Sequence, residues 1–296
     1  MKAGADMREK NISRSMKISI LILCQLIISS LAPIASYYLD SYAKIIAVKL
    51  IYALSFTIPY YLWVRAFRPI GSSRKKRSVC AYKLPAFFVA FAAIVASLQV
   101  NIVLIELIGV SGGSSESSMP EGFFGFLFSF FMYAVIPSAS EELFARATVM
   151  RAAGTGIKAA LFSGVIFGLC HFNPYQLFYS VSCGIILSLL YLYTADIKPA
   201  IYLHFTVNTV VLILSYISKI SSMGVYMAIE SFTWLAILAV GVYFCYILLR
   251  DHQTALNEKT KEILNYKHDI KVREIFSVPL TVVYVIIILA TVLRYI

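Results

Sequence analysis

Long apolar runs separated by short polar segments make up most of the chain, and this pattern predicts membrane-spanning helices. A spanning helix needs about 20 mostly apolar residues. Charge-free stretches of that order occupy residues 18–39, 84–105, 122–140, 199–218, 231–249 and 275–293. Segment 43–63 adds a span with Lys44 and Lys49 near one end, where long side chains reach the polar interface.

One further apolar run, residues 159–195, is too long for a single helix. It contains Asn173-Pro174, a dipeptide typical of turns, so we expect a hairpin of two helices there. Together these segments predict an all-α fold: a polytopic transmembrane helix bundle with about eight or nine membrane spans.

Composition leads to the same class of protein. The 296 residues are 60% hydrophobic and 14% charged, with a mean hydropathy of +0.80, which excludes an ordinary soluble domain. The net charge of +11 follows from basic cytoplasmic loops: with the N-terminus in the cytoplasm, few basic residues face the other side. A basic surface opposite anionic lipid makes the bilayer the expected partner and gives no reason to expect nucleic acid. The five cysteines are scattered singly, so neither a disulfide framework nor a cysteine metal site is predicted.

Two adjacent glutamates stand out because they follow an uncharged, phenylalanine-rich run. An ionised carboxylate is costly in hydrocarbon unless something compensates it or uses it. On a helix, Glu142 and Arg146 share a face and form a natural ion pair. Glu141 is rotated about 100° away and is free to act as a base. The alternative is structural: Ser138 and Glu141 form a capping box after a break at Pro137, although this leaves Glu142 unexplained.

Two other polar stripes lie in the following spans. Phe167 and His171 are four residues apart on one helical face, and so are His204 and Asn208. Each histidine is either a hydrogen-bonded member of the bundle or part of a site. If the stripes converge, they form an intramembrane cavity with the parts of peptide hydrolysis. A glutamate and a histidine activate water, and a histidine and an amide donate to an oxyanion.

The spacing along the chain raises one geometric problem. Glu141 lies roughly 15 Å along its helix from Arg151, whereas His171 lies roughly 20 Å or more along the next helix. Convergence therefore requires tilt, a kink at Pro137, or a helix that begins only after Gly156.

The ordered set of motifs EExxxR, FxxxH and HxxxN resembles the three-motif signature of the CPBP intramembrane protease family, also called Abi or CAAX-protease-like. The seven motif positions are Glu141, Glu142, Arg146, Phe167, His171, His204 and Asn208. All are filled as the family pattern requires, and the resemblance covers about residues 120–215.

The resemblance implies a role for each position. Glu141, helped by His171, would activate the hydrolytic water, and His204 and Asn208 would stabilise the oxyanion. The remaining motif residues would support the site: Glu142 and Arg146 by orienting it, and Phe167 by packing beside it. The resemblance implies a glutamate-dependent site without a metal. The alternative cofactor is zinc held by Glu141, His171 and His204, because these side chains suit that metal.

We therefore expect an intramembrane endopeptidase that cleaves a membrane-associated peptide or protein, such as a bacteriocin or pheromone precursor, in a bacterial cell membrane. The alternative is a non-catalytic membrane regulator or immunity protein that binds a sensor kinase or toxin. Three segments are predicted: a three-span N-terminal scaffold (1–117), a CPBP/Abi-like catalytic core (118–218), and C-terminal spans with a basic cytoplasmic connector (219–296). The sequence does not predict an oligomeric state.

Overall fold

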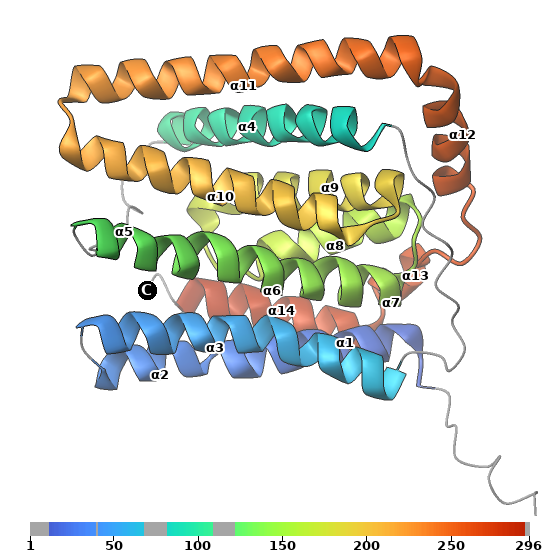
Figure 1. Cartoon of the computed structure of the whole chain (residues 1–296). Coiled ribbons are helices and arrows are strands. Elements are labelled where there is room, and N and C mark those ends of the chain that lie inside the picture. Colours follow the sequence, from blue (N-terminus) through green and yellow to red (C-terminus); the bar gives the residue numbers. More distant parts are fainter. Residues whose placement is uncertain (1–11, 40, 68–81, 109–121, 294–296) are drawn as a thin grey trace, which may run out of the picture.

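The computed structural model describes residues 12–39, 41–67, 82–108 and 122–293, and within these ranges the regular structure is entirely helical. Most of the long helices lie side by side along one common direction (Figure 1). The α-helices are α1 Arg14–Ser29, α2 Leu31–Tyr38, α3 Ser41–Leu62, α4 Lys83–Ile108, α5 Gly122–Ser129, α6 Ile136–Phe144, α7 Arg151–Ala153, α8 Ile157–Leu169, α9 Leu177–Thr194, α10 Ile197–Ile220, α11 Met223–Asp251, α12 Gln253–Leu264, α13 Val272–Ile275 and α14 Val278–Leu293. The predicted all-α bundle is confirmed.

Seven helices in the described part of the chain are long and apolar enough to cross a membrane, by length and composition: Arg14–Tyr38, Tyr42–Phe67, Lys83–Ile108, Gly122–Ala153, Pro174–Thr194, Ile197–Ile220 and Met223–Asp251. The two other predicted spans are the shorter apolar helices α8 and α14. Large apolar side chains stay exposed on the outer helices, for example Phe232, Leu235 and Val242 on α11. An apolar surface this extensive is suited to lipid rather than to water.

Helices α8 and α9 form the predicted hairpin and are in close contact. Its turn lies where the sequence placed it, because Asn173 accepts a hydrogen bond from the Tyr175 N–H and Pro174 begins a short 3-10 turn, η4 (Pro174–Gln176). Glycines allow the close approach of the two helices. A Cβ added at Gly168 would lie 2.7 Å from the Val181 backbone nitrogen, and one added at Gly164 would lie 2.6 Å from that of Ile185.

The helix that carries the two glutamates runs without a break from α5 through α6 to α7. It contains two π-helical segments, η2 (Phe130–Val135) and η3 (Ala145–Met150). Proline lacks an N–H and would normally interrupt the helical hydrogen bonds. Here the π-helical segment before Pro137 accommodates the missing donor, and the helix continues. The capping box is therefore wrong: Ser138 donates its hydroxyl to the Ala134 carbonyl at 2.6 Å instead of capping a new helix.

Helix α8 begins directly after Gly156 because a distant carboxylate caps it. Asp269 accepts hydrogen bonds from the backbone N–H groups of Lys158 at 2.8 Å and Ala159 at 3.1 Å. Such a cap satisfies donors that the first turn of a helix leaves unpaired. The preceding turn has Gly154 at φ 136°, a conformation that favours glycine. This turn fixes where the helix that carries Glu141 ends and where α8, which leads to His171, begins.

The remaining helices enclose these central elements. Helix α4 packs on α9 and α11 packs on α4, while α3 packs on α6 and α1 packs on both α3 and α14. In Figure 1 the central helices α6, α8, α9 and α10 lie between these two groups. Asn101 of α4 ties the start of α9 in place, since it donates to the Tyr175 carbonyl at 3.1 Å and accepts from the Tyr179 N–H at 3.2 Å.

Candidate active site

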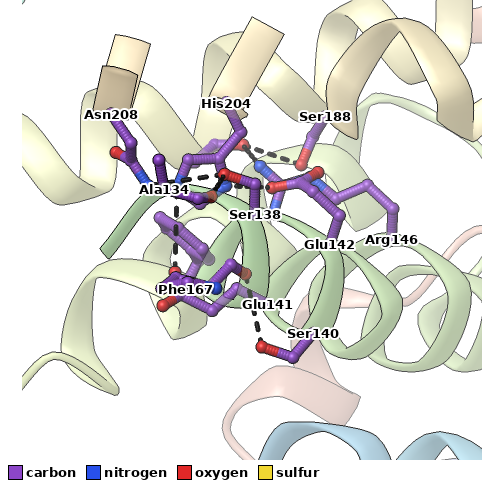
Figure 2. A network of polar contacts seen from close by, with 12 residues as sticks. Ala134, Ser138, Ser140, Glu141, Glu142, Arg146, Phe167, Ser188, His204 and Asn208 are labelled. Carbon is purple, nitrogen blue, oxygen red and sulfur yellow. Dashed lines mark hydrogen bonds and ion pairs between the residues drawn. The ribbon is translucent and has the colours of Figure 1, made fainter. Parts of the chain in front are cut away.

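The two adjacent glutamates on α6 point in different directions, as the 100° rotation between neighbouring helical residues requires. The Glu142 side chain is completely buried, whereas Glu141 keeps 15% of its side chain exposed and lines a cavity. Figure 2 shows both carboxylates with the polar groups around them. The helix thus separates a buried structural charge from one that a bound molecule reaches.

The charge of Glu142 is balanced by Arg146, one helical turn later. Arg146 Nε lies 3.0 Å from Glu142 Oε2, and neither side chain has any exposed surface. Arg146 also donates through Nη2 to the Gly184 carbonyl of α9 at 3.1 Å, and its guanidinium lies 4.9 Å from the centre of the Phe167 ring. The ion pair predicted from the spacing of four is present.

His204 extends this buried network from α10. Its Nδ1 lies 3.0 Å from Glu142 Oε1, and because a carboxylate only accepts, the imidazole is the donor. This contact fixes the ring so that Nε2 faces the cavity, 3.9 Å from Glu141 Oε2. Glu142 therefore orients His204, whose Nε2 atom faces Glu141.

His171 reaches the same oxygen from the turn after α8. Its Nδ1 donates to the Phe167 carbonyl at 2.8 Å, which leaves Nε2 directed at Glu141 Oε2, 3.7 Å away. The Phe167 ring lies edge-on to both imidazoles, with centroids 4.8 Å from His171 and 5.8 Å from His204. Two histidines, one from α10 and one from the turn after α8, thus present the same ring atom to one carboxylate.

The convergence follows from the lengths of the two arms. Twelve residues separate Glu141 from Ala153 at the end of α7, and the same number separates Ile157 from Leu169 in α8. At about 1.5 Å per residue, both arms rise roughly 18 Å from the turn that joins them. His171 lies just beyond the end of α8, level with Glu141. Of the three predicted ways to converge, the late helix start is the one observed.

Asn208 completes the group and is held by a residue whose role the sequence did not reveal. Its Nδ2 donates to Ser138 Oγ at 3.4 Å, and the Ser138 hydroxyl in turn donates a hydrogen bond to the Ala134 carbonyl. Both residues appear near the top of the network in Figure 2. The spacing of Ser138 from Glu141 predicts a helix cap, and no sequence signal pairs Ser138 with Asn208.

All four predicted catalytic residues line one cavity of about 530 Å³: Glu141, His171, His204 and Asn208. Phe167 lines it as well, whereas Glu142 and Arg146 lie behind its wall. Lys49 of α3 also lines the cavity, so its interpretation as a residue that reaches the interface is wrong. Lys44, five residues earlier on the same helix, is exposed and fits that interpretation.

The donor types of Glu141, His171 and His204 suit zinc, but their arrangement does not. Among the residues that the structure describes, no group of three or more His, Cys, Asp or Glu side chains is placed to hold a metal ion. The two Nε2 atoms lie 3.7 and 3.9 Å from the same glutamate oxygen.

Comparison with known protein families finds a match to this segment of the chain. A protein-family model described as type II CAAX prenyl endopeptidase Rce1-like matches residues 123–210, the part of the chain that carries all seven motif positions. No curated protein and no solved structure matches the chain. The predicted resemblance to CAAX-type proteases is thereby confirmed. The match and the apolar helices support an intramembrane protease embedded in the lipid bilayer.

Proposed function

We propose that this chain, whose residues 123–210 belong to the CAAX protease family, uses Glu141 and two histidines to hydrolyse a peptide bond of a membrane-associated peptide or protein. The single observation that carries the proposal is the meeting of Glu141, His171 and His204 at one cavity, with each imidazole held by its own hydrogen bond. The next steps follow from these contacts.

Glu141 is the general base of the proposed reaction. Its contacts of 3.7 and 3.9 Å to the two Nε2 atoms are too long for direct hydrogen bonds and of the size that one water molecule bridges. A water there donates one hydrogen to Glu141 and the other to His171 Nε2, which accepts because Nδ1 carries the proton. Glu141 takes the proton as the water oxygen attacks the carbonyl carbon, and it later delivers that proton to the leaving amine.

His204 and Asn208 stabilise the oxygen that becomes negative in this attack. The carboxylate of Glu142 accepts from His204 Nδ1 at 3.0 Å and so holds the ring with Nε2 toward the cavity; the proposed role requires that Nε2 also carries a proton. Nε2 then donates into the cavity. The amide of Asn208 adds a second donor, oriented by Ser138. Donors fixed in a site shielded from water stabilise a developing oxyanion strongly, by about 3–4 kcal/mol for one donor.

The substrate class follows from the setting. The cavity lies within helices that are long and apolar enough to cross a membrane, so the cleaved segment enters from or through the bilayer. A prenylated CAAX sequence and an apolar bacteriocin or pheromone precursor both fit such an entry route. The excess of basic residues on one side supports an N-terminus in the cytoplasm, and the composition supports a bacterial cell membrane.

Cleavage of fluorescent peptides by the purified protein in lipid nanodiscs tests the proposal. We expect Glu141→Gln and His204→Ala to lower turnover about 100-fold or more, which is the usual contribution of a positioned acid or base. Glu106→Gln serves as the matched control, because Glu106 is an exposed carboxylate on α4. Undiminished turnover in Glu141→Gln would remove the proposal.

Three further experiments distinguish the alternatives. Comparison of the peptides in membranes of wild-type and Glu141→Gln cells identifies a natural substrate, because uncleaved precursor accumulates only in the variant. Treatment with a chelator distinguishes the metal-free reaction, which keeps its rate, from a zinc-dependent one, which loses it and regains it with added zinc. If alanine variants at all four catalytic positions restore a deletion phenotype fully, the protein is a non-catalytic regulator.

A further inference from the structure

The hairpin of α8 and α9 reaches only part of the way along the bundle. Its tip is tied to α4, since Asn101 donates to the Tyr175 carbonyl and accepts from the Tyr179 N–H. Asn101 stands seven residues before the end of α4 at Ile108, which corresponds to about 10 Å of helix rise. Figure 1 shows that α5, α10 and α11 extend beyond the hairpin on this side. The tip therefore lies between the other helices and not at their ends.

This position corresponds to the hydrocarbon of a membrane. Helix α4 has 26 residues and is about 39 Å long, which exceeds the hydrocarbon core of about 30 Å by about 9 Å. With α4 centred in the membrane, each end projects by about 4–5 Å, and the tip beside Asn101 lies about 6 Å inside the hydrocarbon. The chain between α8 and α9 leaves the α-helix here, with Phe172 at φ 51°. Irregular backbone at such a depth is tolerated where it is buried in protein or lines a water-filled cavity.

The active-site cavity adjoins the tip. Asn173 and Gln176 of the tip line the cavity together with Glu141. Lys49 lines it as well, and its ammonium group lies over the ring of Tyr133, eight residues before Glu141 on the same helix. Charged groups at membrane depth are stable where they are paired or in contact with water. The cavity therefore extends from Glu141 toward the end of the bundle where α5 begins.

In the other direction the site is closed by packed apolar side chains. The connector end of the bundle is the end that holds α7, α12 and α13 (Figure 1). Toward this end the central helices and the connector contribute side chains with at most 1% exposure to one hydrophobic core: Phe144, Val149, Met150, Ala153, Ala160, Ile166 and Ile270. Protein cores are close-packed, so this one leaves no passage for a peptide chain. A substrate therefore approaches Glu141 from the opposite half of the bundle.

Charge identifies the connector end as the cytoplasmic one. Lys44 and Lys219 lie toward the opposite end, at the start of α3 and in the last turn of α10. The connector end carries a much larger group of basic residues, which includes Arg14, Lys83, Arg151, Lys158, Arg250, Lys271 and Arg273. Basic segments beside spanning helices stay in the cytoplasm. The open half of the bundle then faces away from the cytoplasm.

From these observations we propose that α8 and α9 form a re-entrant hairpin and that the substrate reaches Glu141 from the non-cytoplasmic half of the membrane. The substrate class is then a peptide or protein segment that has already been inserted into the membrane or exported across it. The tail of a cytoplasmic protein, by contrast, meets the closed connector end. This proposal rests on the proposed function and adds to it the side from which the substrate arrives.

Thiol labelling in oriented membrane vesicles tests this access without any cleavage. The reporter is Gln176→Cys in a chain whose five native cysteines are replaced by alanine. A membrane-impermeant maleimide should label it at least about 10-fold faster in right-side-out than in inverted vesicles, because the reactive thiolate forms only where water reaches the thiol.

Two control positions complete the labelling experiment. Phe178→Cys lies two residues from the reporter on the outer surface of the bundle, where Phe178 is 45% exposed. It should stay unlabelled from either side, because lipid covers it at this depth. Lys271→Cys, at an exposed position of the connector, should be labelled only in inverted vesicles.

Every labelling result decides part of the proposal. Faster labelling of Gln176→Cys in inverted vesicles, or no labelling from either side, would overturn the proposed access. Equal labelling of Phe178→Cys and Gln176→Cys would show that the tip reaches the membrane surface and is not re-entrant. Labelling of Lys271→Cys in right-side-out vesicles would overturn the cytoplasmic assignment of the connector. Met132→Cys, which lines the cavity from a different helix, replaces the reporter if Gln176→Cys does not fold.

Cleavage from each side tests the substrate class. A quenched fluorescent peptide with an apolar segment and a lysine tail is added to vesicles that carry the wild-type protein, and vesicles with Glu141→Gln give the background. We expect turnover at least about 10-fold higher in right-side-out vesicles, because the charged tail does not cross the hydrocarbon. Equal or higher turnover in inverted vesicles would refute the proposal. If neither preparation cleaves the peptide, the proposed function fails, whereas thiol labelling still decides the side of access.

Discussion

The buried ion pair between Glu142 and Arg146 makes the sharpest stability prediction. Both side chains have no exposed surface, and their charged atoms lie 3.0 Å apart. The variant Arg146→Met keeps much of the apolar stem but leaves the carboxylate without its opposite charge. The Gly184 carbonyl, which Arg146 also contacts, still accepts the Ser188 hydroxyl at 2.8 Å. The loss of stability therefore comes mainly from the buried carboxylate that has lost Arg146, and not from an unsatisfied carbonyl.

The expected size of the effect is large. Removal of one partner of a buried ion pair costs about 3–5 kcal/mol, because the other charge stays buried without compensation. Since about 1.4 kcal/mol corresponds to a factor of ten, the unfolding equilibrium shifts at least about 100-fold. The double variant Glu142→Gln with Arg146→Met removes both charges. We expect it to regain stability to within about 1 kcal/mol of the wild type, because a neutral pair of similar volume carries no such penalty.

The double variant distinguishes the effect of the ion pair on stability from its effect on activity. The double variant restores the fold but not the carboxylate that accepts from His204 Nδ1, so peptide cleavage should stay at least about 10-fold below wild type. Stability is measured by SDS titration of the purified protein in mixed micelles, followed by circular dichroism. Arg151→Met is the control, because Arg151 is exposed and its nearby partner is the Tyr191 hydroxyl. An Arg146→Met protein as stable as Arg151→Met would refute the role assigned to the ion pair.

Three other changes test the architecture around the site. Asp269→Ala removes the cap of α8 and should lower the free energy of unfolding by about 1–2 kcal/mol, while Asp251→Ala, at the exposed end of α11, should change it little. Gly168→Ala pushes a Cβ toward the backbone of α9 and should cost about 1–3 kcal/mol in the same titration, whereas Gly224→Ala meets open space and should be tolerated. Ser138→Ala should lower kcat of peptide cleavage about 10-fold with little change in KM, because Asn208 loses its orienting partner; Thr206→Ala, whose hydroxyl contacts its own helix, is the control. A kcat for Ser138→Ala equal to that of Thr206→Ala would show that Ser138 does not orient Asn208.

Sequence reasoning succeeded where local spacing decides the geometry. The pair Glu142 and Arg146 follows from a separation of four residues on a helix, and the turn at Asn173-Pro174 follows from the chemistry of those two residues. The different directions of Glu141 and Glu142 follow from helical rotation alone. In each case the residues that interact are close in the sequence, so the pattern of the chain contains the answer.

It failed where a contact joins distant elements or where the helix departs from regular geometry. The start of α8 depends on Asp269, more than a hundred residues away, and nothing near Gly156 indicates that partner. Ser138 looked like a cap because the sequence does not show that the π-helical segment before Pro137 keeps the helix continuous. Lys49 looked like an interfacial residue because its position near a span end is ambiguous until α3 is packed against α6.

The packing of α3 has a consequence for how the site is built. The family segment, residues 123–210, supplies the glutamates, both histidines and Asn208. One side of the cavity, however, is lined by Lys49, Tyr52 and Phe56, which all belong to α3. The groups proposed to carry out the reaction therefore come from the matched segment, whereas a helix outside it lines one side of the cavity. Among the residues that the structure describes, no side chain of α3 forms a hydrogen bond or ion pair with His204 or Glu141, so substitutions on α3 are expected to change the peptide that is accepted more than the proposed chemistry.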